Sequence, residues 1–218
     1  MIKASEIENL LTLSNEYTVA VKIKSELTER SNERDPFYLT KDELDEILHW
    51  KLRRQYRRSK HWQNANTPEI IKTITSAALA IDVPDFDYEV ELRISILTCL
   101  RGVGVPVASA ILALVYPEKY AVIDFRGWRQ VFGKNKTLFS IGDYKRYLAQ
   151  IRPLAKELDW PIQEVDLAIW ELDLKKSIEA KQQSQSIEGD NKSELSQLDM
   201  KRIVLDQAIK SVKANKCE

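Results

Sequence analysis

The chain has 218 residues, of which 44% are hydrophobic, a balance that permits one packed globular domain with a small appendage and excludes a disordered protein. Lysine plus arginine equals aspartate plus glutamate, 33 against 33, so any attraction to nucleic acid must come from local clusters of charge. Two cysteines are too few for a disulfide framework, a zinc ribbon or a four-thiolate iron–sulfur site.

The N-terminal segment is amphipathic and carries acidic residues, so it lacks the basic start and apolar core of a signal peptide. No apolar run reaches the length of a membrane span. We therefore expect a cytoplasmic protein with no membrane partner. Six glycines in the whole chain, with apolar positions recurring at intervals of three and four, predict an all-α protein.

Helix signals recur along the first half of the chain. Ser5 and the apolar residues after it predict a first helix, and a polar stretch over 26–36 ends it. Residues 41–60 predict a second helix, with Thr40 as its cap and Glu43 as the capping-box partner. Thr67 followed by Pro68 opens a helix to about Ile81, and Asp87 begins one that reaches Leu100.

Further helices are predicted near 141–157 and 161–182. We expect residues 1–182 to form one helical domain. Residues 183–197 are polar and poor in bulky apolar side chains, which is typical of a linker. Residues 198–218 regain an apolar stripe and predict an amphipathic helix. That helix docks on its own domain, on a protein partner or on a second copy of the chain.

Residues 100–105 hold two glycines one residue apart between helix-forming runs. Gly102 and Gly104 can take a positive φ without steric cost, so we expect a tight helix–helix hairpin with Val103 pointing inward. The surrounding amides and the N-terminus of the next helix then face outward and favour a phosphate. An ordinary turn between helices is the alternative.

Residues 100–129 resemble the helix-hairpin-helix superfamily of DNA glycosylases, to which endonuclease III belongs. Members carry a Leu-Pro-Gly-Val-Gly hairpin, a helix with small residues, a short loop and an essential aspartate after an apolar pair. The matching positions are Leu100, Gly102, Val103, Gly104, Ala108, Leu112, Val122, Ile123 and Asp124. The resemblance implies a glycosylase-like helical fold with Asp124 as the catalytic residue. It also implies hairpin contacts to DNA at Gly102, Val103, Gly104 and Val105.

Two departures from the family pattern matter. Bifunctional members have a lysine two residues after the second glycine, where this chain has Pro106, so a Schiff base is not available at that position. No cysteine cluster follows the hairpin, so the iron–sulfur cluster of endonuclease III is absent. The resemblance therefore implies a monofunctional glycosylase, or a protein that kept the fold and lost the chemistry.

Asp124 follows an apolar run and precedes a predicted helix. Cleaving an N-glycosidic bond builds positive charge on the deoxyribose, and a carboxylate beside the anomeric carbon can stabilise that charge and align a water molecule. Aspartate is also an ordinary N-cap, and a cap alone would account for its position. The two roles are compatible.

Residues 48–62 contain no acidic residue, whereas residues 41–46 are mostly acidic. Lys51, Arg54 and Arg58 would share one face of the expected helix, and such a stripe can follow a phosphate backbone. We predict DNA contacts from Lys51, Arg53, Arg54, Arg57 and Arg58. Solvated surface is the alternative, because most charge runs have no partner.

Aromatic residues are interleaved with these charges. Trp50 and Tyr56 are predicted to stack on an extruded base, although Trp50 also suits the core. Relatives of the glycosylase fold resemble this chain in a Trp-Lys pair on an N-terminal helix. That likeness implies that Trp50 and Lys51 line the cleft opposite Asp124, with Lys51 as a candidate amine nucleophile.

After Asp124, Arg126 and Arg129 can reach a phosphate beside a flipped nucleotide. The two histidines match no metal motif, so we expect no metal-based catalysis and no cofactor, apart from a monovalent cation at the hairpin. The favoured interpretation is a monofunctional DNA glycosylase. The alternatives are a non-catalytic nucleic-acid-binding module and a protein that recruits others through its C-terminal helix.

Overall fold

The computed structural model describes residues 2–11 and 15–183. The chain divides into two compact units, residues 1–173 and 174–218. Of the second unit only residues 174–183 are described, and they are helical. The predicted linker beyond its first residue and the predicted helix over 198–218 lie outside the described residues. The described part of the chain contains helices and no strand, which confirms the all-α prediction.

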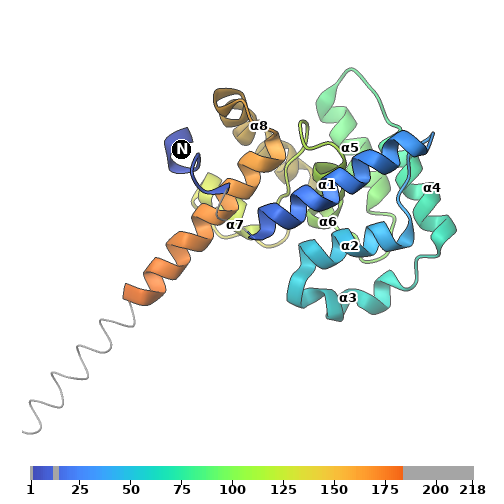
Figure 1. The fold of residues 1–218 in the computed structure, drawn as a ribbon, viewed down its shortest axis with the longest axis horizontal. Helices are drawn as coiled ribbons and strands as arrows, with labels where there is room; N and C mark the ends of the chain where they lie inside the picture. Colours follow the sequence, from blue (N-terminus) through green and yellow to red (C-terminus); the bar gives the residue numbers. More distant parts are fainter. Residues whose placement is uncertain (1, 12–14, 184–218) are drawn as a thin grey trace, which may run out of the picture. The chain divides into compact units, whose positions relative to one another are not determined.

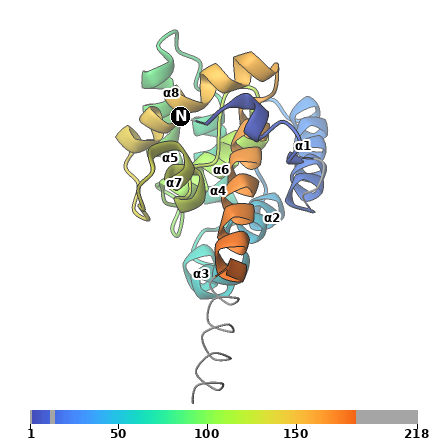
Figure 2. The same cartoon turned by 90° about the vertical axis from the view of Figure 1, so that its left-hand side faces the viewer.

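The helices of the first unit are named in chain order (Figures 1 and 2). They are η1 (Ala4–Glu6), α1 (Asn15–Glu33), α2 (Lys41–Leu52), η3 (Arg53–Gln55), α3 (Tyr56–Gln63), α4 (Pro68–Leu79), α5 (Phe86–Leu97), α6 (Val105–Val115), α7 (Phe125–Phe132) and α8 (Ile141–Leu158). Residues 162–173 are also helical. None of the described helices is both long enough and apolar enough to cross a lipid bilayer.

Helix α6 lies at the centre of the core. Its residues 107–114 are all buried. Helices α1, α2 and α5 pack against it, and α4 and α8 pack against α5. In Figure 1, α1 crosses in front of α6. Ala108, Ala110 and Ala113 have no side chain beyond Cβ, so they allow neighbouring helices to approach closely.

The N-terminal prediction was wrong in its boundaries. The segment around Ser5 forms only the 3₁₀ turn η1, and the long helix is α1, which includes most of the polar stretch expected to end a helix. Burial explains the difference. Ala20, Ile23 and Leu27 recur at spacings of three and four and are buried, so one apolar stripe is enough to hold an otherwise polar helix.

The predicted helix over 41–60 is interrupted at Arg53, which has a φ of 49°. Its start is as predicted, with the capping box between Thr40 and Glu43. At the break, the Arg53 guanidinium lies 4.3 Å from the centre of the Trp170 ring and 3.0 Å from a Glu16 carboxylate oxygen. Because the helix is interrupted there, the single basic face expected for Lys51, Arg54 and Arg58 does not form.

The connection between α5 and α6 is the predicted hairpin. Gly102 has a φ of 80°, which favours glycine, and Val103 is buried as expected. Gly104 is extended, and an added Cβ would come no closer than 3.9 Å to Pro106, so of the two hairpin glycines only Gly102 is in a conformation that requires glycine. Buried Asn66 braces the turn through two 2.9 Å hydrogen bonds with the main chain of Arg101.

Candidate active site

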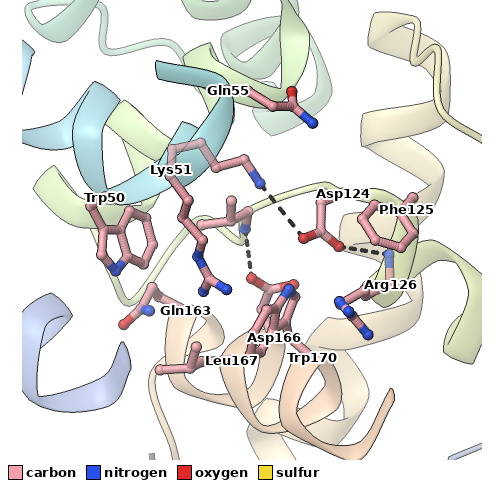
Figure 3. Close-up of a pocket in the computed structure, with 12 residues that line it drawn as sticks. Trp50, Lys51, Gln55, Asp124, Phe125, Arg126, Gln163, Asp166, Leu167 and Trp170 are labelled. Atoms are coloured by element: carbon pink, nitrogen blue, oxygen red, sulfur yellow. Dashed lines mark hydrogen bonds and ion pairs between the residues drawn. The ribbon is translucent and has the colours of Figure 1, made fainter. Parts of the chain in front are cut away.

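A cavity of about 240 Å³ lies among α2, η3, the start of α7 and helical residues 162–173. Figure 3 shows Lys51 and Asp124 pointing toward each other across it. The lining residues are Trp50, Lys51, Arg53, Gln55, Val122, Asp124, Phe125, Arg126, Gln163, Asp166, Leu167 and Trp170. The cavity therefore combines five charged side chains with the aromatic rings of Trp50, Phe125 and Trp170.

The segment that carries Asp124, residues 120–124, is held by buried side chains from three helices. The Tyr144 hydroxyl donates to the Ala121 carbonyl oxygen over 2.8 Å. The Val122 amide donates to Asp166 over 3.0 Å, and the Ile123 amide donates to the Ser109 hydroxyl over 3.1 Å. Consecutive peptide groups are thus fixed by side chains from α8, residues 162–173 and α6. This arrangement fixes the position of Asp124.

Asp124 caps α7 with one carboxylate oxygen and presents the other to the cavity. Its Oδ1 accepts hydrogen bonds from the Arg126 and Gly127 amides, each over 2.9 Å. Its Oδ2 lies 3.8 Å from the Lys51 Nζ atom. The side chain is 20% exposed, so water and a ligand can reach it. The predicted cap is therefore present, and it leaves one oxygen available for chemistry.

Lys51 is nearly enclosed, with 11% of its side chain exposed. Its Nζ atom donates a long hydrogen bond of 3.4 Å to the Ile123 carbonyl oxygen. Burial lowers the pKa of this amine, while the charges of Asp124 and Asp166 oppose that shift. The structure therefore places Trp50 and Lys51 at the cavity beside Asp124, the arrangement that the likeness to relatives of the glycosylase fold implied.

Asp166 is a site residue that the sequence analysis missed. It is 5% exposed and accepts a 2.6 Å hydrogen bond from the Tyr147 hydroxyl. Burial, supported by the nearby Asp124 charge, raises the pKa of Asp166 to about 7, although hydrogen bonds from Tyr147 and Val122 favour its ionised form. An added Cβ on Gly127 would lie 2.1 Å from the Tyr147 hydroxyl oxygen, so α7 needs glycine there.

The other predicted residues lie in three places. Arg126 and Arg129 both form ion pairs with Asp173, which is 1% exposed, and Arg126 also lines the cavity. Tyr56 donates a 2.8 Å hydrogen bond to Asp45 and is not among the residues lining the cavity. The side chains of Arg54, Arg57 and Arg58 are exposed on η3 and α3.

The hairpin presents main-chain donors. Among the described residues, no hydrogen-bond acceptor is found for the amides of Gly102, Gly104 and Val105. The Val103 amide donates to the Leu100 carbonyl oxygen over 3.1 Å. Three of the four predicted hairpin residues therefore keep an amide available. The monovalent cation expected there stays a prediction.

A signal for the missed side of the cavity was present in the sequence. Gln163 and Asp166 interrupt an apolar stripe that runs from Ile162 to Leu172, and polar residues within a buried stripe often line a site. Trp170 lies four residues after Asp166, on the same helical face. The sequence analysis read this segment only as a helix.

Comparison with models of known protein families, with curated proteins and with solved structures finds no match for this chain. The resemblance to helix-hairpin-helix glycosylases therefore depends on residues 100–129 and on the Trp50–Lys51 pair. Within the described residues, no group of three or more histidine, cysteine, aspartate or glutamate side chains is placed to hold a metal ion.

Proposed function

We propose that this protein is a DNA glycosylase that takes a modified base into the cavity beside Asp124 and hydrolyses its N-glycosidic bond. One observation carries the proposal: Asp124 and Lys51 meet in a cavity with aromatic side chains. A carboxylate on a helix cap would occur in many proteins. A carboxylate facing a buried lysine in a cavity that Trp50 and Trp170 also line is suited to a planar ligand that reacts.

The proposed reaction uses the Oδ2 atom of Asp124. As the base departs, positive charge develops on the sugar, and a carboxylate beside the anomeric carbon stabilises it. The same oxygen can align the attacking water molecule. Two amides of α7 and the fixed segment 120–124 hold the carboxylate in place, so little reorganisation is needed during the reaction.

Two surfaces are available for the DNA backbone. Helix α3 has the sequence YRRSKHWQ, which contains no acidic residue, and its Arg57 and Arg58 side chains are exposed. The hairpin offers the amides of Gly102, Gly104 and Val105, which suit a phosphate oxygen. Arg126 and Arg129 contribute less in this proposal, because Asp173 already neutralises part of their charge.

The test is base release from duplexes that carry oxidised, deaminated, alkylated and hypermodified bases, detected by strand cleavage in alkali. We expect release of at least one base class and no strand cleavage without alkali. Binding of every duplex with a steep salt dependence, and release from none, would contradict the proposal and favour the non-catalytic binding module.

A lyase step after base release is a second candidate, favoured by the burial of Lys51. A lowered pKa increases the neutral fraction of the amine, which is the nucleophilic form. The amine nitrogen would bond to C1′ of the abasic aldehyde, and a water molecule would leave to give an imine.

Borohydride should then trap the protein on abasic DNA, and Lys51→Ala should reduce trapping at least about a hundredfold, as expected for loss of a nucleophile. The matched control is Lys156→Ala, which changes an exposed lysine of α8. Equal trapping by wild type and Lys51→Ala would remove Lys51 from the chemistry.

A further inference from the structure

One wall of the cavity carries buried polar groups that have no partner among the described residues. Gln163 is 0% exposed, and both its side-chain oxygen and its side-chain nitrogen lack a hydrogen bond. The indole nitrogen of Trp50 is also buried without a partner. Both residues line the cavity, and in Figure 3 the indole nitrogen of Trp50 lies on the ring edge turned toward Gln163.

Such an arrangement is costly unless a ligand or a bound water molecule completes it. A buried donor or acceptor without a partner typically costs about 1–3 kcal/mol, and most buried polar groups in proteins are satisfied. The Gln163 main chain is fixed by a 3.0 Å hydrogen bond from its amide to the Pro117 carbonyl oxygen. Its side-chain amide has no hydrogen bond to break, so turning it toward a ligand in the cavity carries no such loss.

The geometry points to Gln163 and Trp50 as the residues that select the ligand of this cavity, by hydrogen bonding to the edge of a heterocyclic ring. The inference rests on the proposed function, since it treats the cavity as the place of an extruded base. It goes beyond that function because it assigns base selection to two residues that take no part in the proposed bond cleavage.

The atoms on this wall define which edge fits. The Gln163 oxygen accepts one hydrogen bond, while the Gln163 nitrogen and the Trp50 indole nitrogen each donate one toward the ligand. A complementary edge therefore offers two acceptors and one donor. Uracil has its donor between two acceptors and fits when the Gln163 oxygen lies between the two protein donors. Cytosine has its donor at one end of the edge and fits the opposite orientation of the amide. Adenine offers one acceptor and one donor, and guanine offers one acceptor and two donors.

The size of the cavity agrees with this selection. At about 240 Å³ it is smaller than the pockets of roughly 300–1,000 Å³ that hold drug-sized ligands. Trp170 and the side chain of Leu167 border the same space, and the Arg53 guanidinium lies 4.3 Å from the centre of the Trp170 ring, so a flat ring has planar and apolar contacts beside the polar edge. A single ring with a two-acceptor, one-donor edge is the ligand chemistry that satisfies these observations together.

The experiment follows the side-chain N–H resonances of isotopically labelled full-length protein during titration with free uracil, cytosine, adenine and 3-methyluracil. We expect uracil and cytosine to shift the Trp50 indole and Gln163 amide resonances. The indole of Trp62, which is 54% exposed and outside the cavity, should not move. We expect 3-methyluracil, which lacks the N3–H donor between the two carbonyl oxygens, and adenine to bind at least about tenfold more weakly.

Two variants complete the experiment. Gln163→Leu should weaken uracil binding about tenfold, whereas Gln150→Leu, on the exposed face of α8, should leave it unchanged. Equal binding of uracil, adenine and 3-methyluracil, or no shift at Trp50 and Gln163, would overturn the inference. This comparison of ligands uses wild-type protein, so it remains decisive even if Gln163→Leu does not fold.

Free bases also separate this inference from the proposed function. Selective binding of free uracil without base release from any duplex would contradict the proposed enzyme activity. It would support ligand selection by Gln163 and Trp50. Equally fast release of bases that differ in the donors and acceptors on their edges would support the enzyme. It would overturn the assignment of base selection to Gln163 and Trp50.

Discussion

At the scale of single residues, the site depends on close contacts that a larger side chain would disrupt. The Tyr147 hydroxyl lies between Asp166 and the first turn of α7, and it can do so only because Gly127 has no Cβ. Asp166 in turn holds the Val122 amide, two residues before Asp124. The position of the proposed catalytic carboxylate therefore depends on a glycine three residues after it.

Gly127→Ala should destabilise the protein by roughly 2–4 kcal/mol, because the new methyl group would displace the Tyr147 hydroxyl and disturb Asp166. Chemical denaturation measures the change. The control is Gly142→Ala in the first turn of α8, where the nearest atom would be 3.7 Å away and the helix should gain a few tenths of a kcal/mol. A similar effect of both substitutions would show that the close approach to Tyr147 is unimportant.

Asp166 should also make stability depend on pH. Its pKa is raised to about 7 in the folded protein from 3.8, so the folded state binds a proton that the unfolded state has lost between these values. The free energy of unfolding therefore falls as the pH rises from about 4 to about 7, by at most about 4 kcal/mol. Asp166→Asn should flatten this dependence, measured by denaturation at several pH values. An identical pH profile for both proteins would contradict the assignment.

At the scale of elements, the helix starts that depend on neighbouring residues were predicted correctly, whereas the helix interruption that involves distant residues was not. The Thr40 capping box and the Thr67 cap with Pro68 are formed by neighbouring residues, so the sequence contained everything needed. The break at Arg53 is accompanied by contacts with Trp170 and Glu16, which are far away in the sequence. No local pattern indicated that a run of helix-forming residues would stop there.

The interruption of the helix at Arg53 separates the basic residues into one that lines the cavity and others that lie on the surface. Lys51 turns into the cavity, while Arg57 and Arg58 of α3 stay on the surface, where they can meet DNA phosphates. We expect Arg57→Gln and Arg58→Gln each to reduce the slope of log affinity against log salt concentration by about 0.9. Lys156→Gln on α8 is the control and should leave the slope unchanged. Unchanged slopes for both arginine variants would exclude α3 from the DNA contact.

At the scale of the whole molecule, balanced charge makes local placement decisive. With 33 basic and 33 acidic residues there is no general attraction to DNA, so in the proposed function the acid-free helix α3 and the hairpin amides supply the contacts to the backbone. The candidate site is likewise assembled from distant segments: α2, residues 120–124 and residues 162–173. The sequence predicted Asp124, Lys51 and Trp50, but Gln163 and Asp166 come to line the same cavity only through the fold.

The measurement that tests the central claim most directly compares base release by wild type, Asp124→Asn and Asp85→Asn under single-turnover conditions. Asparagine still caps a helix, so Asp124→Asn should keep its fold while base release falls at least about a hundredfold. Asp85 caps α5 and does not line the cavity, so Asp85→Asn makes the same change elsewhere and should react like wild type. Undiminished release by folded Asp124→Asn would contradict the account.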